Sequence, residues 1–188
     1  LFVQYLKSDL NSVFKKVEIK RLQSEIKIAA KLPERFIEIY DKIHSVTSTS
    51  NILIEWGTKS YNKNCPCLDV ASISRDLTMN QNRITGNRYV LAWKLEKELS
   101  QIECLNYLVT KYDFSYNNKG IYQASKFYFD TELDSLNTEQ FAVLILMMEN
   151  SLLYNPKKNP KRIEKELEKL EAKLTKITEE QKDERNCL

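Results

Sequence analysis

Residues 138–149 constrain the fold of this chain more than any other stretch. The run from Phe141 to Met148 contains no charged or polar side chain, so a helix here would be apolar on nearly every side. Such a helix belongs inside a core, because a surface helix keeps one polar face. We therefore expect residues 138–149 to form a buried helix with the other elements around it. Ser135 or Asn137 offers its N-cap, and Glu139 lies in the first turn, where negative charge is favoured.

Apolar side chains recur at helical spacing in several other segments. Helices are therefore expected over 1–29, 68–79, 90–99 and 102–112. Another helix begins at Leu32-Pro33, since proline is tolerated in a first turn. The pattern of residues 52–61 fits a short helix or a strand. The chain has only 3 Gly and 4 Pro, too few for the many tight turns of a sandwich or barrel. The sequence therefore predicts an all-α or mainly α fold.

Composition narrows the function classes. Apolar residues make up 42% and charged residues 29%, which is typical of a globular domain. The net charge of +3 is too small to indicate nucleic-acid binding, so we expect no nucleic-acid partner. No apolar run is long enough to span a bilayer. The first residue is Leu rather than Met, so we expect the natural start to lie upstream, where an anchor would not be visible.

Two charged segments flank the middle of the chain. In the N-terminal helical segment, 1–31, the basic residues are Lys15, Lys16, Lys20 and Arg21. They form either a solvated helix face or a juxtamembrane segment attracted to anionic lipid. The C-terminal segment, 161–188, is a charged helix from about Lys161 to Glu184. Its narrow apolar stripe consists of Ile163, Leu167, Leu170, Leu174 and Ile177. This stripe either docks on the core or binds a partner protein.

The four cysteines are Cys65, Cys67, Cys104 and Cys187. Their spacing does not match a zinc site, and the sole histidine, His44, is distant in sequence. A Cys65–Cys67 disulfide would close a very short ring and is disfavoured. We interpret the cysteines as ordinary thiols, with Cys104 filling part of the core. The redox compartment stays open.

Several short segments carry a resemblance to a known family. They are 91–96 (LAWKLE) followed by Ser100, 119–125 (KGIYQAS) followed by Tyr128-Phe129, the set Leu136, Glu139 and Ala142, and Tyr154-Asn155-Pro156 followed by 159–162 (NPKR). With these spacings, residues 88–162 resemble the glycosyltransferase domain of penicillin-binding proteins, family 51. Residues 72–77 (SISRDL) are similar to a further helix of that family. On this basis residues 32–160 form the family 51-like domain.

The resemblance implies a lysozyme-like, mainly helical domain that polymerises glycan strands from lipid II at the bacterial cell envelope. In that family one glutamate takes a proton from the acceptor hydroxyl. A second glutamate, with basic residues and a divalent metal, serves the departing pyrophosphate. The chemistry needs both, because a sugar hydroxyl is a poor nucleophile without a base and a diphosphate leaving group needs nearby positive charge.

This chain departs from the family where the chemistry takes place. The positions of family acids, amides and a motif glycine carry other residues: Tyr40, Arg75, Asp76, Arg88, Asn106, Thr110, Tyr122 and Asp130. Tyr40 and Arg88 stand where the two catalytic glutamates are expected. Loss of one proton-transfer group costs roughly 10²–10⁴ in rate. The sequence therefore predicts a degenerate, non-catalytic domain that binds a ligand or serves as a scaffold.

The candidate site residues follow from these departures. Glu38, Asp41 and Asp76 are weak stand-ins for the lost acids, and each is otherwise a solvated acid. The candidate anion-binding residues are Arg75, Arg83, Arg88 and Lys94, whose alternative interpretation is plain surface charge. No cofactor is expected, and a divalent metal only if the domain is active. The expected ligand is lipid II or another phosphate-bearing envelope molecule.

Two alternatives stay open. The domain is either an active glycosyltransferase with relocated carboxylates or a protein-interaction module that uses the helix Lys161–Glu184. Localisation is expected at the cell envelope, close to the membrane, on the periplasmic face of the inner membrane if an anchor precedes Leu1.

Overall fold

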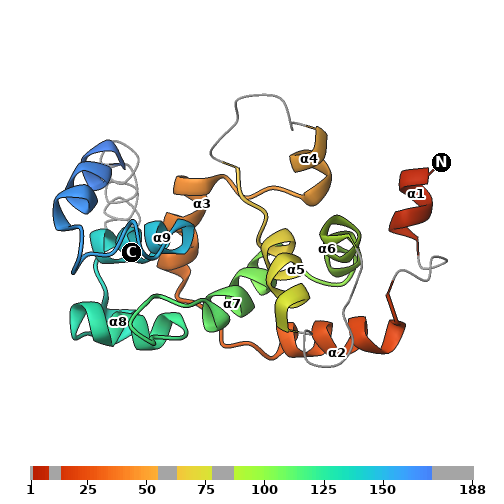
Figure 1. Ribbon diagram of the computed structural model, residues 1–188, viewed down its shortest axis with the longest axis horizontal. Helices are drawn as coiled ribbons and strands as arrows, with labels where there is room; N and C mark the ends of the chain where they lie inside the picture. Colours follow the sequence, from red (N-terminus) through yellow and green to blue (C-terminus); the bar gives the residue numbers. More distant parts are fainter. Residues whose placement is uncertain (1, 9–13, 55–62, 78–86, 171–188) are drawn as a thin grey trace, which may run out of the picture. The chain divides into compact units, whose positions relative to one another are not determined.

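The computed structural model describes residues 2–8, 14–54, 63–77 and 87–170 (Figure 1). Across these ranges the chain forms helices and two isolated β-bridges, Val46 with Asn64 and Asp113 with Lys119, and no strand. The predicted mainly α fold is confirmed.

The helices fall into two compact units that interleave in sequence. One unit combines residues 1–31 with 46–108, and the other combines 32–45 with 109–188. We call them the first and the second unit and describe each separately. The two units are defined by their internal contacts and not by function. The division into functional segments at residues 31 and 160 therefore stays a prediction.

The first unit contains most of the N-terminal half of the chain. Its helices are α1 (Phe2–Lys7), α2 (Lys16–Lys27), α4 (Thr49–Ile54), α5 (Pro66–Leu77), α6 (Arg88–Glu96) and most of α7 (Gln101–Lys111). Helices α5 and α6 pack closely on each other, burying Val70 and Ala71 of α5 against the apolar residues of α6. The single helix predicted over 1–29 is wrong. Helix α1 ends at Lys7, and α2 begins only after Lys15, whose backbone is extended.

A disulfide between Cys67 and Cys104 joins the start of α5 to α7, with the two Cα atoms 5.0 Å apart. The interpretation of Cys104 as a simple core thiol is therefore wrong, although its side chain is fully buried. Sequence spacing could not pair these residues, because 37 positions separate them and only the packing of α5 on its neighbours brings them together. Cys65 remains a buried free thiol, and Cys187 lies outside the described residues.

The second unit is built around the helix that the sequence placed in the core. Its elements are α3 (Glu34–His44), α8 (Ile121–Phe129), the 3₁₀ helix η1 (Leu133–Ser135), α9 (Thr138–Glu149) and a helix over residues 160–170. Every residue of α9 from Phe141 to Met147 is buried. The Phe36 ring of α3 meets the Phe141 ring edge-on, with centroids 5.7 Å apart. The prediction of a buried helix over 138–149 is confirmed.

Capping and docking at the ends of this unit follow the sequence. Asn137 and Gln140 form a reciprocal capping box at the start of α9, so Asn137 rather than Ser135 is the N-cap.

Ile163, the first residue of the predicted C-terminal stripe, is buried at 6% exposure. This burial favours docking of the helix 160–170 on its own chain. Leu174 and Ile177 lie outside the described residues.

Helix α8 was not predicted from periodicity. It begins after Gly120, whose φ of 87° is in the left-handed region. A Cβ atom at this position would lie 3.1 Å from the carbonyl oxygen of Thr110, so the close approach also requires glycine. The glycine at position 120 is therefore required by the backbone geometry at the start of α8.

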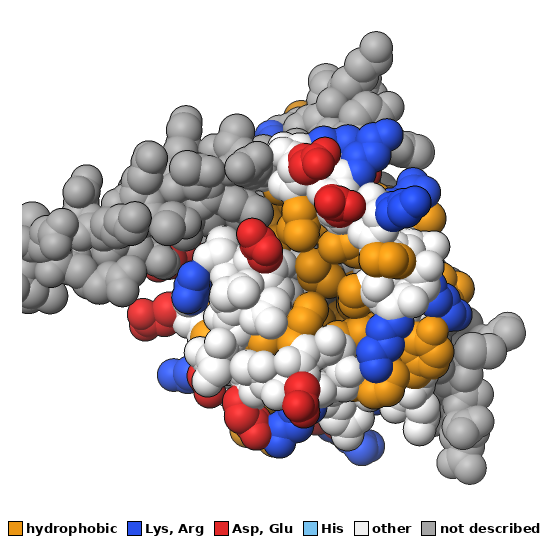
Figure 2. All heavy atoms as spheres, turned by 90° about the vertical axis from the view of Figure 1, so that its left-hand side faces the viewer, with side chains coloured by type: hydrophobic (Ala, Val, Ile, Leu, Met, Phe, Trp, Pro, Cys, Tyr) orange, Lys and Arg blue, Asp and Glu red, His pale blue; other side chains and the backbone are white. Residues whose placement is uncertain are grey.

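One face of the second unit combines aromatic rings with lysines. Tyr116 and Phe127 are 50% and 37% exposed. The Lys157 ammonium lies 3.7 Å from the centroid of the Phe127 ring, and that of Lys158 lies 5.1 Å from the Tyr116 ring. Figure 2 shows hydrophobic side chains gathered in a hollow on the side of α8, with basic side chains beside them. Cation–π contacts therefore shield part of the exposed aromatic area.

Asp130 gives a direct test of the local backbone. It follows α8 with φ 52° and ψ 34°, in the left-handed region. Since an L side chain costs about 1 kcal/mol there relative to glycine, Asp130→Gly should be more stable to urea than Asp130→Ala by about 1 kcal/mol. The same pair at exposed Gln123, inside α8, should show the reverse order by about 1 kcal/mol. An alanine variant that is the more stable at both positions would contradict the left-handed geometry.

Candidate functional site

Two residues at expected acid positions, Tyr40 and Asn106, are buried. Tyr40 is 1% exposed on α3, with its ring centroid 6.2 Å from that of Phe36 and 5.0 Å from that of His44. Asn106 is 6% exposed on α7. A phenol and an amide at these places cannot accept a proton near neutral pH as a carboxylate does.

Two of the proposed stand-in acids lie on the surface of a helix. Glu38 and Asp41 are exposed on α3 in the second unit. Arg75 and Asp76 belong to α5 in the first unit, and their side chains are not described. Arg83 lies outside the described residues. These five residues therefore stay predictions.

His44 lies one turn after Asp41 on α3 and is buried in the second unit. Its imidazole Nε2 lies 3.6 Å from the Glu149 carboxylate at the end of α9, and His44 is 7% exposed. Burial raises the pKa of the Glu149 carboxyl, and the nearby Glu166 charge raises this pKa further. The pair joins the ends of α3 and α9.

Glu96, one of the acids that match the family pattern, accepts several hydrogen bonds in the first unit. Its Oε1 accepts from the Thr49 backbone N–H at 2.7 Å and the Thr49 hydroxyl at 2.9 Å. The same oxygen accepts from the Gln101 amide at 2.8 Å and from the Cys65 thiol at 3.4 Å. Burial raises the pKa of Cys65 to about 11, so the thiol stays protonated and can donate. Glu96 thus ties α4, α5 and α7 to α6.

Asn155 and Asn159, which belong to the family-like segments 154–156 and 159–162, have a similar structural role. The Asn155 amide donates to the Tyr128 hydroxyl at 3.0 Å, and its Oδ1 accepts from the Lys157 N–H at 3.0 Å. The Asn159 amide donates to the carbonyls of Leu152 and Leu153. These two asparagines therefore stabilise the turn that follows α9. Their hydrogen bonds account for their presence without a catalytic role.

Asp69 is a titratable residue that the sequence did not single out. It lies on α5, and burial raises the pKa of its carboxyl to about 6, although the charge of Arg88 on α6 lowers it in part. A lone aspartate in an amphipathic helix carries no sequence signal. Only the packing of α5 on α6 buries it near a guanidinium.

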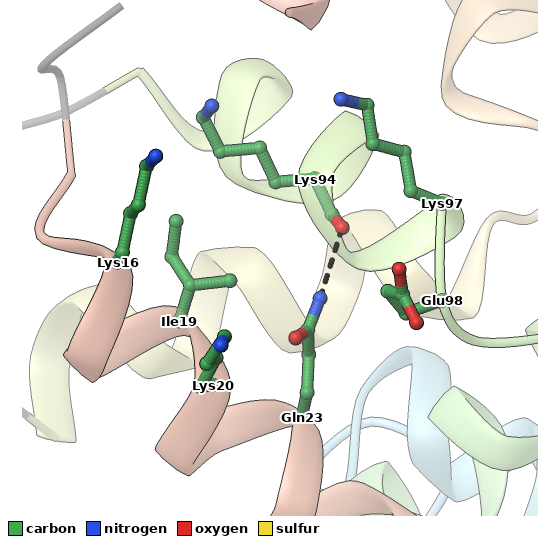
Figure 3. Close-up of a pocket in the computed structure, with 7 residues that line it drawn as sticks. All are labelled: Lys16, Ile19, Lys20, Gln23, Lys94, Lys97 and Glu98. Carbon is green, nitrogen blue, oxygen red and sulfur yellow. Dashed lines mark hydrogen bonds between the residues drawn. The ribbon is translucent and has the colours of Figure 1, made fainter. Parts of the chain in front are cut away.

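A basic pocket of about 270 Å³ lies between α2 and the end of α6 (Figure 3). It is lined by Lys16, Ile19, Lys20, Gln23, Lys94, Lys97 and Glu98. The Gln23 amide donates to the Lys94 carbonyl at 3.2 Å and joins the two walls. We call this cavity the lysine pocket.

Two of the four cationic residues that the sequence grouped as one anion site, Arg88 and Lys94, can be placed in the first unit. Lys94 lines the lysine pocket, is 4% exposed, and donates through Nζ to the Ser8 carbonyl at 3.0 Å. Arg88 is exposed at the start of α6, beside Tyr89 and Asp69. Six helical positions rotate one side chain from the other by roughly 120°. Arg88 and Lys94 therefore do not share one site.

The resemblance implies a divalent metal, and the described residues offer no place for one. Among them, no group of three or more His, Cys, Asp or Glu side chains could hold a metal ion. In the same part of the chain, no helix combines the length and apolar character needed to cross a membrane.

Comparison with known families agrees with the sequence motifs. Residues 74–175 match the transglycosylase family, which covers more than half of the chain. The chain therefore belongs to the transglycosylase family, and its mainly helical architecture is the one expected of such a domain. No curated protein matches the sequence. Helix α2, which supplies one wall of the lysine pocket, lies outside the matched residues.

Proposed function

We propose that this protein is a degenerate, non-catalytic member of the family that binds a lipid II-like, phosphate-bearing glycan lipid at the bacterial cell envelope. The observation that carries the proposal is the replacement of both expected catalytic glutamates, by buried Tyr40 and by Arg88. Glu96, an acid that matches the family pattern, has a hydrogen-bonding role inside the first unit.

The disulfide supports a location outside the cytoplasm. Disulfides such as Cys67–Cys104 persist in oxidising compartments and are rare in reducing ones. A transglycosylase-like domain that meets lipid II on the outer side of the plasma membrane would fold under those conditions. The juxtamembrane role of the N-terminal segment remains part of this proposal.

Incubation with fluorescently labelled lipid II tests the non-catalytic assignment. We expect no glycan polymer from the full chain under conditions in which an active transglycosylase polymerises the substrate, because loss of a proton-transfer group alone costs roughly 10²–10⁴ in rate. Binding of the same labelled lipid II should still be measurable by fluorescence anisotropy. Polymer formation that disappears in Glu38→Gln or Asp41→Asn, but not in exposed Asp134→Asn, would overturn the proposal.

One observation favours the active alternative. Asp69 has a carboxyl pKa of about 6 and lies near Arg88, which is suitable for a general base close to neutral pH. If the chain were active through Asp69, polymerisation would rise as pH increases through about 6, since a base must be deprotonated. Asp69→Asn would then abolish both the activity and this pH dependence.

A further inference from the structure

One turn of the second unit holds three consecutive residues in the left-handed region. Ser115, Tyr116 and Asn117 have φ angles of 71°, 53° and 62°. Left-handed backbone is unfavourable for a residue with a bulky side chain, and it persists only where the surrounding structure fixes it, often at functional sites. Tyr116 is nevertheless 50% exposed, so its ring gains little burial in return. The turn therefore presents an aromatic side chain to the solvent.

Hydrogen bonds from two directions hold this turn. The Tyr128 hydroxyl of α8 donates to the Phe114 carbonyl at 2.6 Å, and the Ser115 hydroxyl donates to the Ser151 carbonyl at 3.2 Å. The Phe114 N–H also donates to the Asn118 carbonyl across the turn at 2.9 Å. A surface that is fixed before its partner arrives loses less conformational entropy on binding.

Four residues make up what we call the aromatic–lysine face: Tyr116, Phe127, Lys157 and Lys158. The two ring centroids lie 5.5 Å apart, and each ring carries an ammonium group, that of Lys157 on Phe127 and that of Lys158 on Tyr116. In the described part of the chain neither lysine forms an ion pair, whereas Lys126 pairs with Glu132 at 2.7 Å. A ring attracts a cation without neutralising its charge. Both ammonium groups can therefore still pair with a carboxylate.

Shape and charge favour a protein segment over a membrane as the occupant of this face. The hydrophobic side chains on this side gather in a hollow, which admits a chain segment better than it fits a flat bilayer (Figure 2). The exposed acids Asp130, Glu132 and Asp134 follow α8 directly. An anionic lipid surface would be repelled by them, whereas a short segment needs only the two lysines.

We propose that the aromatic–lysine face binds an acidic, extended segment of a partner protein. Two carboxylates of that segment pair with Lys157 and Lys158, and a neighbouring apolar side chain packs on the rings of Tyr116 and Phe127. Side chains i and i+2 of an extended chain point to the same side and lie roughly 7 Å apart. With ring centroids 5.5 Å apart, carboxylates at i and i+2 match the two ammonium groups that the rings carry.

This inference goes beyond the proposed function and does not rest on it. It involves neither the replaced acids nor a glycan lipid, and the helix Lys161–Glu184 that the sequence offered as an interface is not part of the face. A peptide selection contains no lipid II, so its failure would leave the proposed function untouched.

The experiment is selection from a randomised peptide-display library on the full chain and on two matched variants. Lys157→Gln/Lys158→Gln removes both charges of the face, and Lys15→Gln/Lys16→Gln removes an adjacent, exposed lysine pair from the first unit. The wild type and the control variant should enrich peptides with acidic residues two positions apart and a neighbouring apolar residue. The face variant should not enrich them.

Fluorescence anisotropy of the best selected peptide then gives the affinities. The wild type should bind with a dissociation constant below about 100 μM, and Lys157→Gln/Lys158→Gln about tenfold or more weakly, since two charge-assisted contacts are lost. The control variant should stay within about twofold of the wild type, because distant exposed charges are screened.

Two substitutions at Tyr116 separate binding from folding. Tyr116→Ala and Tyr116→Gly both remove the ring and should each weaken binding of the selected peptide about tenfold. Because a φ of 53° suits glycine, Tyr116→Gly should unfold at a higher urea concentration than Tyr116→Ala. A folded glycine variant that binds the peptide as tightly as the wild type would contradict the role of the ring.

Three further results would overturn the inference. The first is a wild-type selection without enrichment of acidic peptides. The second is an equal loss of affinity in the face and control variants, which would show general attraction to lysines. The third is sedimentation with phosphatidylglycerol–phosphatidylcholine vesicles that only the face variant loses, without acidic peptides in the selection, which would identify a lipid surface as the occupant.

Discussion

Replacing Cys67 and Cys104 together by alanine should lower the free energy of unfolding of the chain by about 4 kcal/mol, from the loop-closure entropy of the 37-residue separation. The bond joins α5 to α7, and both sulfurs are buried in the first unit. Urea unfolding followed by circular dichroism measures the loss.

Reduction provides the matched control for this prediction. Dithiothreitol should destabilise the wild type by a similar amount and should leave the double variant unchanged. Cys65 should react slowly with iodoacetamide in the folded chain, because burial raises its pKa to about 11 and thiolate is the reactive form. A wild type that is insensitive to reductant would show that the disulfide does not stabilise the fold.

Glu96→Ala should lower the free energy of unfolding by about 3–5 kcal/mol, because it leaves several hydrogen-bond donors, some of them buried, without an acceptor. Thr49 is fully buried, and both its N–H and its hydroxyl donate to Glu96. Glu96→Gln should cost less, since an amide oxygen still accepts but without the charge. Differential scanning calorimetry and urea unfolding should give the order wild type, glutamine, alanine.

Glu98 is the control for Glu96, only two residues away and exposed. Glu98→Ala should change stability by less than about 0.5 kcal/mol, as is usual at an exposed position outside a network. If Glu96→Ala lowers the free energy of unfolding no more than Glu98→Ala does, the hydrogen bonds to Glu96 do not stabilise the fold. The retention of a glutamate here would then need another explanation.

Glu96 and Tyr40 illustrate the pattern on which the non-catalytic proposal rests. Glu96 belongs to the hydrogen-bonded interior, so changing it would weaken the first unit. Tyr40 replaces an expected acid and is instead packed against Phe36. Under the proposed function, the family-like residues that serve packing and turns are present, and those expected to serve proton transfer are replaced. This pattern is the reason for proposing that the domain is non-catalytic.

The sequence by itself determined the features that depend on local chemistry. The apolar run 141–148 required a buried helix, and the sequence offered Ser135 or Asn137 as its N-cap, of which the structure uses Asn137. Periodicity located α5, α6 and α7, because apolar spacing reports the face that packs. It did not locate α8, whose start depends on the backbone of Gly120 against Thr110. The single helix expected over 1–29 was wrong for a similar reason, since apolar spacing does not report a backbone break.

Only the tertiary structure decided which distant side chains meet. The Cys67–Cys104 bond, the burial of Asp69 near Arg88 and the lysine pocket each join segments that sequence spacing leaves unrelated. Lys16 and Lys94 are far apart along the chain, and no periodicity relates them. Their proximity depends on how α2 packs on α6, and packing is a property of whole helix faces rather than of single residues.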